Sequence, residues 1–238
     1  MRNGGRSVKI VRYLGIGLVA VAFFALIVSN IGNKNHADAV WDEAATMGRM
    51  DAKHYFIFYT DLACPYCEAF SQAIFEHEDE FKRDYIEGKD ILYEVRVTDF
   101  LYEFGEHKPE MSRWSAEGIY CAANENKFWD YYRTALETLN EDYYSKGIGV
   151  SKTAPMISDM TADYWLNIGK KVGLGEEFVS CFTEHKTVDK IKENAAKAAQ
   201  QVQGGLPFFK FDKFTTGGFD TAWGWDYVKK YLDAGLSS

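Results

Sequence analysis

The chain has 238 residues, of which 47% are hydrophobic, 26% charged and 16% aromatic. This composition excludes a disordered chain, a collagen-like fibre and a small disulfide-rich scaffold, and it can fill one medium-sized core. The formal net charge is −8, and residues 1–12 contribute cations without any acid, so the remainder is more acidic than the whole chain. An acidic body does not favour binding to nucleic acid, so no nucleic acid is expected among the partners.

The N-terminal segment has the composition of a membrane-spanning helix. Residues 13–33 contain no charged side chain and are apolar from Leu14 to Val28. At about 1.5 Å per residue, a helix of this length can cross the hydrocarbon core of a lipid bilayer. The cations before it and the acids after it place the N-terminus in the cytoplasm. We therefore expect a basic cytoplasmic tail over 1–12, a single transmembrane helix over 13–33, and a body outside the cytoplasmic membrane.

A cleaved signal peptide is the alternative interpretation of this segment. Ala37-Asp38-Ala39 resembles a cleavage site, although the apolar core of a signal peptide is shorter, at roughly 7–15 residues. Cleavage near Ala39 would release the body as a secreted protein, whereas an uncleaved helix would anchor it in the bilayer. In both cases the body is exported.

The body begins with a strand that leads into a helix. Residues 34–50 are largely polar and are expected to form a tether with little regular structure. Tyr55–Tyr59 is a run of aromatic and β-branched residues, which predicts a strand buried on both faces. Cys64-Pro65-Tyr66-Cys67 follows, and apolar residues then recur at helical spacing, namely Phe70, Ile74, Phe75 and Phe81. The C-x-x-C motif is thus placed where a strand turns into a helix, with Pro65 in its first turn.

A long helical insertion separates this start from the end of the domain. Ile91–Val97 alternates like a second strand, which a β-α-β unit would place parallel to the first. After Pro207, a strand over Phe208–Phe211 turns toward Phe214 in a hairpin, and a last helix follows. We therefore expect an α/β sheet domain over 51–105 and 204–238, interrupted by an all-helical insertion over 106–203. The helical periodicity is found in Trp114–Ala123, Phe128–Leu139, Tyr164–Val172, Thr187–Val202 and, at the C-terminus, Trp223–Ala234.

The four cysteines carry the candidate chemistry. A cysteine at the start of a helix faces unpaired N–H groups and the positive end of the helix dipole, which favour its thiolate. Cys64 is therefore the candidate nucleophile, and Cys67, one turn further into the helix, is the candidate resolving thiol. A static disulfide between the two is the alternative. The spacing of the cysteines and histidines does not indicate zinc, so no metal is expected.

Several features together resemble the DsbA-like thiol:disulfide oxidoreductases. They are Asp61-x-x-Cys64-Pro65-Tyr66-Cys67, Gly205-Leu206-Pro207-Phe208, and the helical insertion with Cys121-Ala122-Ala123 and Lys127-Phe128-Trp129-Asp130-Tyr131. The resemblance spans about residues 55–232. It implies a thioredoxin fold in which Pro207 is a cis-proline that faces the cysteine pair and Leu206 pairs with an extended substrate chain. An ordinary turn proline before a strand is the alternative.

The resemblance also bears on residues outside the motif. Related exported proteins carry cysteines at places similar to Cys121 and Cys181, so we predict a structural disulfide between these two; buried free thiols are the alternative. Tyr66 stands where the best-known oxidases of the family have His, which implies a lower reduction potential. Asp61 is placed either to relay protons to Cys67 or to cap the active-site loop.

The resemblance implies a membrane-tethered thiol:disulfide oxidoreductase that forms disulfides in extracytoplasmic proteins. Its substrates would be reduced or misoxidised exported proteins, and a quinone-linked membrane partner would re-oxidise it. No cofactor is expected. A reductase or isomerase of the same fold is one alternative, and a non-catalytic chaperone-like binding module is another.

Overall fold

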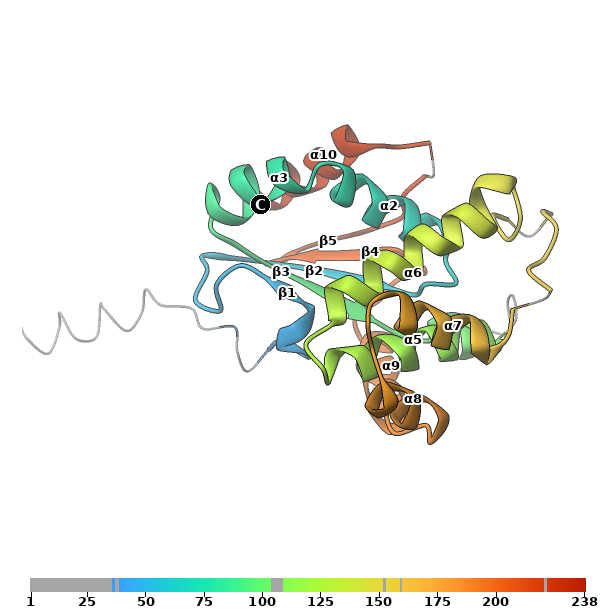
Figure 1. Cartoon of the computed structure of the whole chain (residues 1–238). Coiled ribbons are helices and arrows are strands. Elements are labelled where there is room, and N and C mark those ends of the chain that lie inside the picture. The colour runs from blue at the N-terminus through green and yellow to red at the C-terminus, as the bar shows by residue number, and fades with distance from the viewer. Residues whose placement is uncertain (1–35, 37–38, 104–108, 152, 159, 221) are drawn as a thin grey trace, which may run out of the picture.

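The computed structural model describes residue 36 and residues 39–103, 109–151, 153–158, 160–220 and 222–238. Its centre is a five-stranded sheet in the order β1-β3-β2-β4-β5 (Figure 1). β2 and β3 are parallel, and the other neighbouring strands are antiparallel. The predicted β-α-β unit and the predicted C-terminal hairpin are therefore confirmed. The strands are β1 Thr46–Met47, β2 His54–Thr60, β3 Ile91–Val97, β4 Phe208–Phe211 and β5 Phe214–Gly217.

Helices cover both faces of the sheet (Figure 1). On one face lie α2 (Pro65–Glu76), α3 (Glu78–Glu80), the π-helical η2 (Phe81–Glu87) and α10 (Trp225–Leu236). The helical part that follows β3 comprises α4 Phe100–Glu103, α5 Pro109–Ala123, α6 Phe128–Asp142, η3 Tyr144–Lys146, α7 Ala162–Lys171, α8 Glu176–Thr183 and α9 Val188–Ala199. Each predicted helical segment thus contains a helix. The sequence pattern missed α8, because eight residues give only two turns over which a period can be recognised.

The alternation of side chains along β2 gives the sheet two apolar faces. Phe56 and Phe58 point toward α2, where the Phe58 and Phe70 ring centroids are 4.7 Å apart. Tyr55, Ile57 and Tyr59 point to the opposite face and pack with Ala198 of α9. β2 is therefore buried on both faces, as its sequence predicts. β2 and α2 both lie within this core, and the C-x-x-C motif stands where α2 begins.

The segment before the sheet is more ordered than predicted. Residues 34–50 were expected to be a tether, but Glu43–Ala45 form the 3-10 helix η1 and Thr46–Met47 form β1 against β3. Glu94 of β3 accepts a hydrogen bond from the Trp41 backbone N–H at 2.6 Å, and the Arg96 guanidinium lies 4.4 Å from the centre of the Trp41 ring. The prediction of a tether was wrong because the residues that order this segment lie about fifty positions further along the chain.

The predicted tail over 1–12 and the predicted transmembrane helix over 13–33 lie outside the described residues. Within the part that the structure describes, no helix is both long enough and apolar enough to cross a membrane.

Candidate active site

The C-x-x-C motif lies at the amino end of α2. Cys64 is the N-cap residue of the helix, and Pro65 is its first helical residue. The Cys64 carbonyl accepts hydrogen bonds from the backbone N–H groups of Cys67 at 3.0 Å and Glu68 at 3.1 Å. Both thiols of the motif are free. The Cys64 sulfur therefore lies at the helix end where the dipole and the unpaired N–H groups favour a negative charge.

The two cysteines differ in their surroundings. Cys64 is 5% exposed and Cys67 is fully buried, while Tyr66 between them is 38% exposed. Burial, together with the hydrogen bond to Cys64 and the charge of Cys64, raises the pKa of the Cys67 thiol well above its usual value. Cys64 is thus the more accessible sulfur, and Cys67 retains its proton to a higher pH than an ordinary thiol.

The loop before β4 brings Leu206 and Pro207 to the cysteine pair. The Leu206–Pro207 peptide bond is cis. The Leu206 carbonyl accepts a hydrogen bond from the Cys64 thiol, with 3.8 Å between sulfur and oxygen. This juxtaposition follows from the pairing of β4 with β2, which sets Phe208 opposite Tyr59 just before the motif. Leu206, which the family resemblance predicted to lie at the cysteine pair, is therefore a neighbour of Cys64.

Asp61 is a buried carboxylate at the end of β2. Its Oδ1 accepts a hydrogen bond from the Ala63 N–H at 2.8 Å, and its Oδ2 accepts hydrogen bonds from the Leu101 N–H at 2.9 Å and the Ser112 hydroxyl at 2.5 Å. The Asp61 carbonyl also accepts from the Cys64 N–H at 3.0 Å. These hydrogen bonds correspond to one of the two roles predicted for Asp61, namely the cap of the active-site loop.

The pKa of Asp61 is compatible with a role in proton exchange. Burial raises the pKa of Asp61 from 3.8 to about 6, and the charge of Asp99 adds to this rise, whereas the three hydrogen bonds to its side chain oppose it. The main chain of Asp61 hydrogen-bonds Cys67. The charge of Asp61 also raises the pKa of the Cys67 thiol, so the carboxyl group, with a pKa of about 6, lies near the resolving thiol.

Two further residues, one from the helical part and one from α2, support the active-site turn, and neither was predicted from the sequence. Tyr144 of η3 donates a hydrogen bond to the Leu62 carbonyl at 2.9 Å. Ser71, one turn beyond Cys67, donates to the Cys67 carbonyl at 3.0 Å and contacts the Tyr132 hydroxyl at 2.7 Å. The spacing of four residues between Cys67 and Ser71 was the available signal for Ser71. No local pattern pointed to Tyr144.

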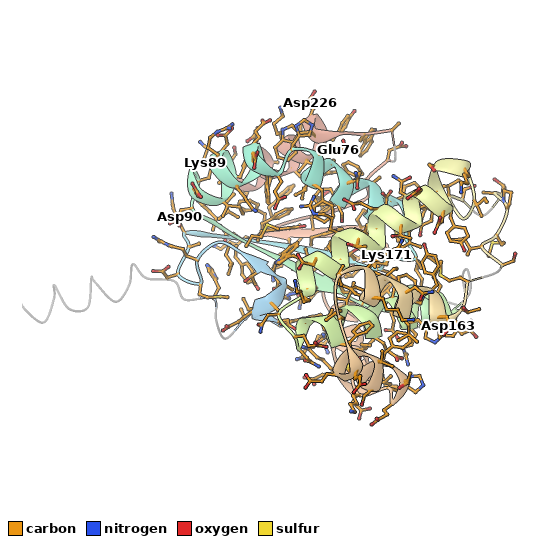
Figure 2. All side chains as sticks on the ribbon, in the orientation of Figure 1. Glu76, Lys89, Asp90, Asp163, Lys171 and Asp226 are labelled. Carbon is orange, nitrogen blue, oxygen red and sulfur yellow. A yellow bond between two sulfur atoms is a disulfide. The ribbon has the colours of Figure 1, made fainter. Side chains whose placement is uncertain are left out.

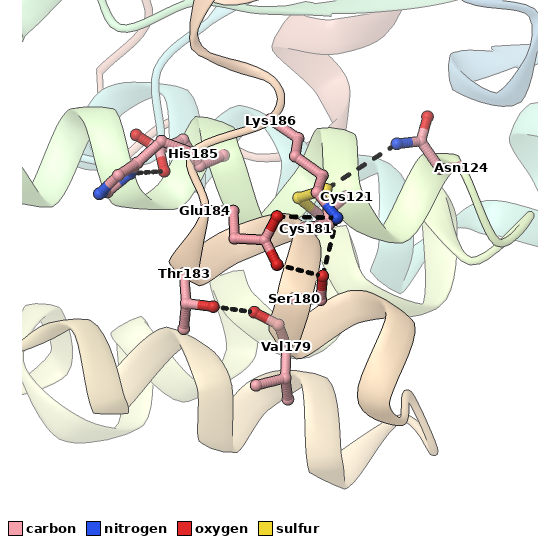
Figure 3. Close-up of a disulfide and its surroundings, with 10 residues drawn as sticks. Cys121, Asn124, Val179, Ser180, Cys181, Thr183, Glu184, His185 and Lys186 are labelled. Atoms are coloured by element: carbon pink, nitrogen blue, oxygen red, sulfur yellow. Dashed lines mark hydrogen bonds and ion pairs between the residues drawn. A yellow bond between two sulfur atoms is a disulfide. The ribbon is translucent and has the colours of Figure 1, made fainter.

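The other two cysteines form a disulfide apart from this site. Cys121 of α5 and Cys181 of α8 are joined, with 5.8 Å between their Cα atoms and 60 positions between them in the sequence (Figure 3). The Asn124 amide lies 3.9 Å from the Cys181 sulfur. The bond cross-links two helices of the helical part. Among the described residues, no group of three or more His, Cys, Asp or Glu side chains is placed to hold a metal ion.

Comparison with known proteins agrees with this geometry. A family model described as thioredoxin matches residues 42–213. No curated protein matches the sequence.

Among solved structures, the thiol-disulfide exchange protein α-DsbA2 from Wolbachia pipientis is 18% identical, with 84% of this chain and 91% of that chain covered and a TM-score of 0.54. BdbD from Bacillus subtilis, in its oxidised form, is 15% identical, with coverages of 87% and 98% and a TM-score of 0.60. The catalytic domain of ScsC from Proteus mirabilis is 17% identical, with coverages of 85% and 96% and a TM-score of 0.51. At these identities the similarity shows a shared fold.

Proposed function

The chain belongs to the thioredoxin family, and we propose that it is a DsbA-like thiol:disulfide oxidoreductase that forms disulfides in proteins exported from the cytoplasm. One observation carries this proposal. Cys64 stands at the amino end of α2 beside the Leu206 carbonyl, with Cys67 buried behind it. A thiol pair in that setting suits exchange better than a static cross-link.

The exchange proceeds in two steps that conserve electrons. A substrate thiolate attacks the Cys64 sulfur of the Cys64–Cys67 disulfide, an S–S bond forms between substrate and Cys64, and Cys67 leaves as a thiolate that takes up a proton. A second substrate thiolate then attacks the substrate sulfur of this mixed disulfide and releases Cys64. The substrate has lost two electrons, and the cysteine pair has gained them.

The surroundings of the pair assist each step. The raised pKa of Cys67 favours its protonation once it has left, and Asp61 is the nearby carboxyl that we propose as the proton donor. The helix dipole stabilises Cys64 as the leaving thiolate of the second step. Leu206, which touches Cys64, is the residue that we propose to pair with an extended substrate.

The cellular setting completes the proposal. Residues 13–33 would anchor the protein in the cytoplasmic membrane, with the catalytic body outside the cytoplasm. Each turnover leaves the pair reduced, so a quinone-linked membrane partner would re-oxidise it.

Tyr66 offers no positive charge beside the cysteines, and this observation favours the alternative, a reductase or isomerase with a lower potential.

The reduction potential of the Cys64–Cys67 pair distinguishes these directions. It would be measured on the full-length protein in detergent, equilibrated with glutathione buffers. A potential of about −120 to −150 mV would support the oxidase, because such a pair readily gives up its disulfide. A potential of about −250 mV or below would overturn it in favour of the reductase or isomerase.

A further inference from the structure

A second candidate site adjoins the cysteine pair along α2. A cavity of about 510 Å³ is bounded on one side by Pro65, Glu68, Gln72 and Glu76. Their spacing of three and four residues puts them on one face of the helix, and Glu76 lies at its carboxyl end (Figure 2). The opposite walls come from α6, from η3 and the residues after it, and from the segment before α10; they include Asn140, Tyr144 and Trp223.

Among the described residues, the walls of this cavity offer hydrogen-bond acceptors and no cation. Glu68 is only 5% exposed, and its Oε1 has no hydrogen-bond partner among the described residues; the same holds for Oε1 of Gln72. The Asn140 side chain hydrogen-bonds the Glu68 carboxylate, and the Gln72 amide donates to Glu76 at 3.4 Å. None of the described residues that line the cavity is Lys, Arg or His.

A buried acceptor without a hydrogen-bond donor is costly. The unpartnered oxygens of Glu68 and Gln72 therefore indicate that a ligand supplies the donor. Burial and the charge of Glu76 raise the pKa of Glu68 to about 7, which is the direction expected for a carboxylate that lacks a cation. A protonated amine or guanidinium that enters the cavity would supply such a donor to the Glu68 carboxylate.

We propose that this cavity is a subsite for a Lys or Arg side chain of the substrate polypeptide, close in sequence to the cysteine that exchanges with Cys64. The proposal rests on the proposed exchange function and adds a substrate preference to it. Glu68 follows Cys64 by four residues, which is about 6 Å along the helix axis. A long cationic side chain within two or three residues of the substrate cysteine reaches that distance.

The test uses the full-length oxidised protein and short reduced peptides with one cysteine. A single Lys, Arg or norleucine is placed in turn at each of the three positions on either side of that cysteine. Stopped-flow tryptophan fluorescence gives the rate at which each peptide reduces the Cys64–Cys67 disulfide. Each rate is divided by the rate of the same peptide with oxidised glutathione, which removes differences in thiol reactivity. Dithiothreitol serves as a reductant without charge.

We expect Lys and Arg peptides to react about tenfold faster than the norleucine peptide at one or more positions, because a charged hydrogen bond in a buried site is worth at least that factor. Glu68→Gln should bring the ratio close to one, and it should lower the rates of the Lys and Arg peptides by a larger factor than the dithiothreitol rate. Glu137→Gln, at an exposed position on α6, is the matched control and should keep the full ratio. Gln72→Leu provides a second variant that should lower the ratio even if Glu68→Gln does not fold.

Two results would overturn the subsite. One is equal normalised rates for the Lys, Arg and norleucine peptides at every position in the wild-type protein. The other is an equal loss of the peptide and dithiothreitol rates in Glu68→Gln, because Glu68 would then act on the cysteine pair and not on the substrate. Failure of the wild-type disulfide to react with any peptide or with dithiothreitol would instead contradict the proposed exchange function.

Discussion

The Ser112 hydroxyl donates a hydrogen bond to Asp61 at 2.5 Å, and this contact joins α5 of the helical part to the loop that precedes Cys64. Both residues are fully buried. The same carboxylate accepts from the Ala63 and Leu101 N–H groups. One side chain therefore holds the active-site loop in place against the helices that cover it, and its ionisation is coupled to the stability of both parts.

Asp61 makes stability depend on pH in an unusual direction. Its pKa rises from 3.8 to about 6 in the folded protein, so between these values the folded state keeps a proton that the unfolded state has lost. The contribution of this group to stability is present below pH 4 and is lost as the pH rises to 6, by up to about 3 kcal/mol.

Urea unfolding of wild-type protein and Asp61→Asn at pH 4, 5, 6 and 7 checks this expectation. The wild type should lose free energy of unfolding relative to the variant over this range, because Asn does not ionise. A difference between the two proteins that stays constant across the four pH values would contradict the expectation.

A buried ion pair fixes the segment before the sheet. Glu94 and Arg96 of β3 are paired at 2.7 Å, and the Arg96 guanidinium also donates to the Ala39 carbonyl at 2.7 Å and to Tyr59. We expect Arg96→Met to lower the free energy of unfolding by about 3–5 kcal/mol, because Glu94 is then buried without its cation. Glu94→Gln combined with Arg96→Met should cost less than Arg96→Met alone.

Chemical denaturation of these variants gives the values. Glu193→Gln, which removes an exposed ion pair with Lys197 on α9, is the control and should leave the denaturation midpoint unchanged. If Arg96→Met were as stable as that control, the pair would not hold the segment.

The parts of this fold that the sequence predicts are those with a local signal. The aromatic run of β2, the Cys64-Pro65-Tyr66-Cys67 turn and the periodicity of α2 are contiguous, so their arrangement can be read from neighbouring residues. β1 has only two residues and exists because β3 pairs with it. Its signal therefore lies in another part of the chain.

Glu68 shows the same limit at the candidate site. A glutamate one turn into a helix is typical of a solvated face, and nothing near it in the sequence indicates otherwise. Its burial depends on the packing of α2 against α6, where Asn140 lies about seventy positions further along. Asp61 was recognised as a candidate from the sequence, but its role as a cap of the active-site loop became visible only with its partners Ser112 and Leu101.

The Cys121–Cys181 disulfide should contribute to stability without taking part in exchange. It closes a loop across 60 positions, which corresponds to about 4 kcal/mol from the reduced entropy of the unfolded chain. We expect Cys121→Ala with Cys181→Ala to lower the free energy of unfolding by a comparable amount, measured in urea without reductant. The rate at which dithiothreitol reduces Cys64–Cys67 should not change. An altered rate in a folded double variant would mean that the two cysteine pairs are coupled.

The order of attack at the motif can be tested by trapping. The proposed exchange passes through a mixed disulfide between the substrate and Cys64, from which Cys67 can displace the substrate. Cys67→Ser incubated with a substrate disulfide should therefore accumulate a mixed disulfide through Cys64, because the thiol that would displace the substrate is missing. Cys64→Ser should accumulate none, because Cys67 is fully buried and its raised pKa keeps it protonated. Non-reducing electrophoresis followed by mass spectrometry of the linked peptides identifies the cysteine involved. A stable adduct on Cys67 in the Cys64→Ser variant would reverse the two roles, since it would require the buried sulfur to be the one that substrates reach.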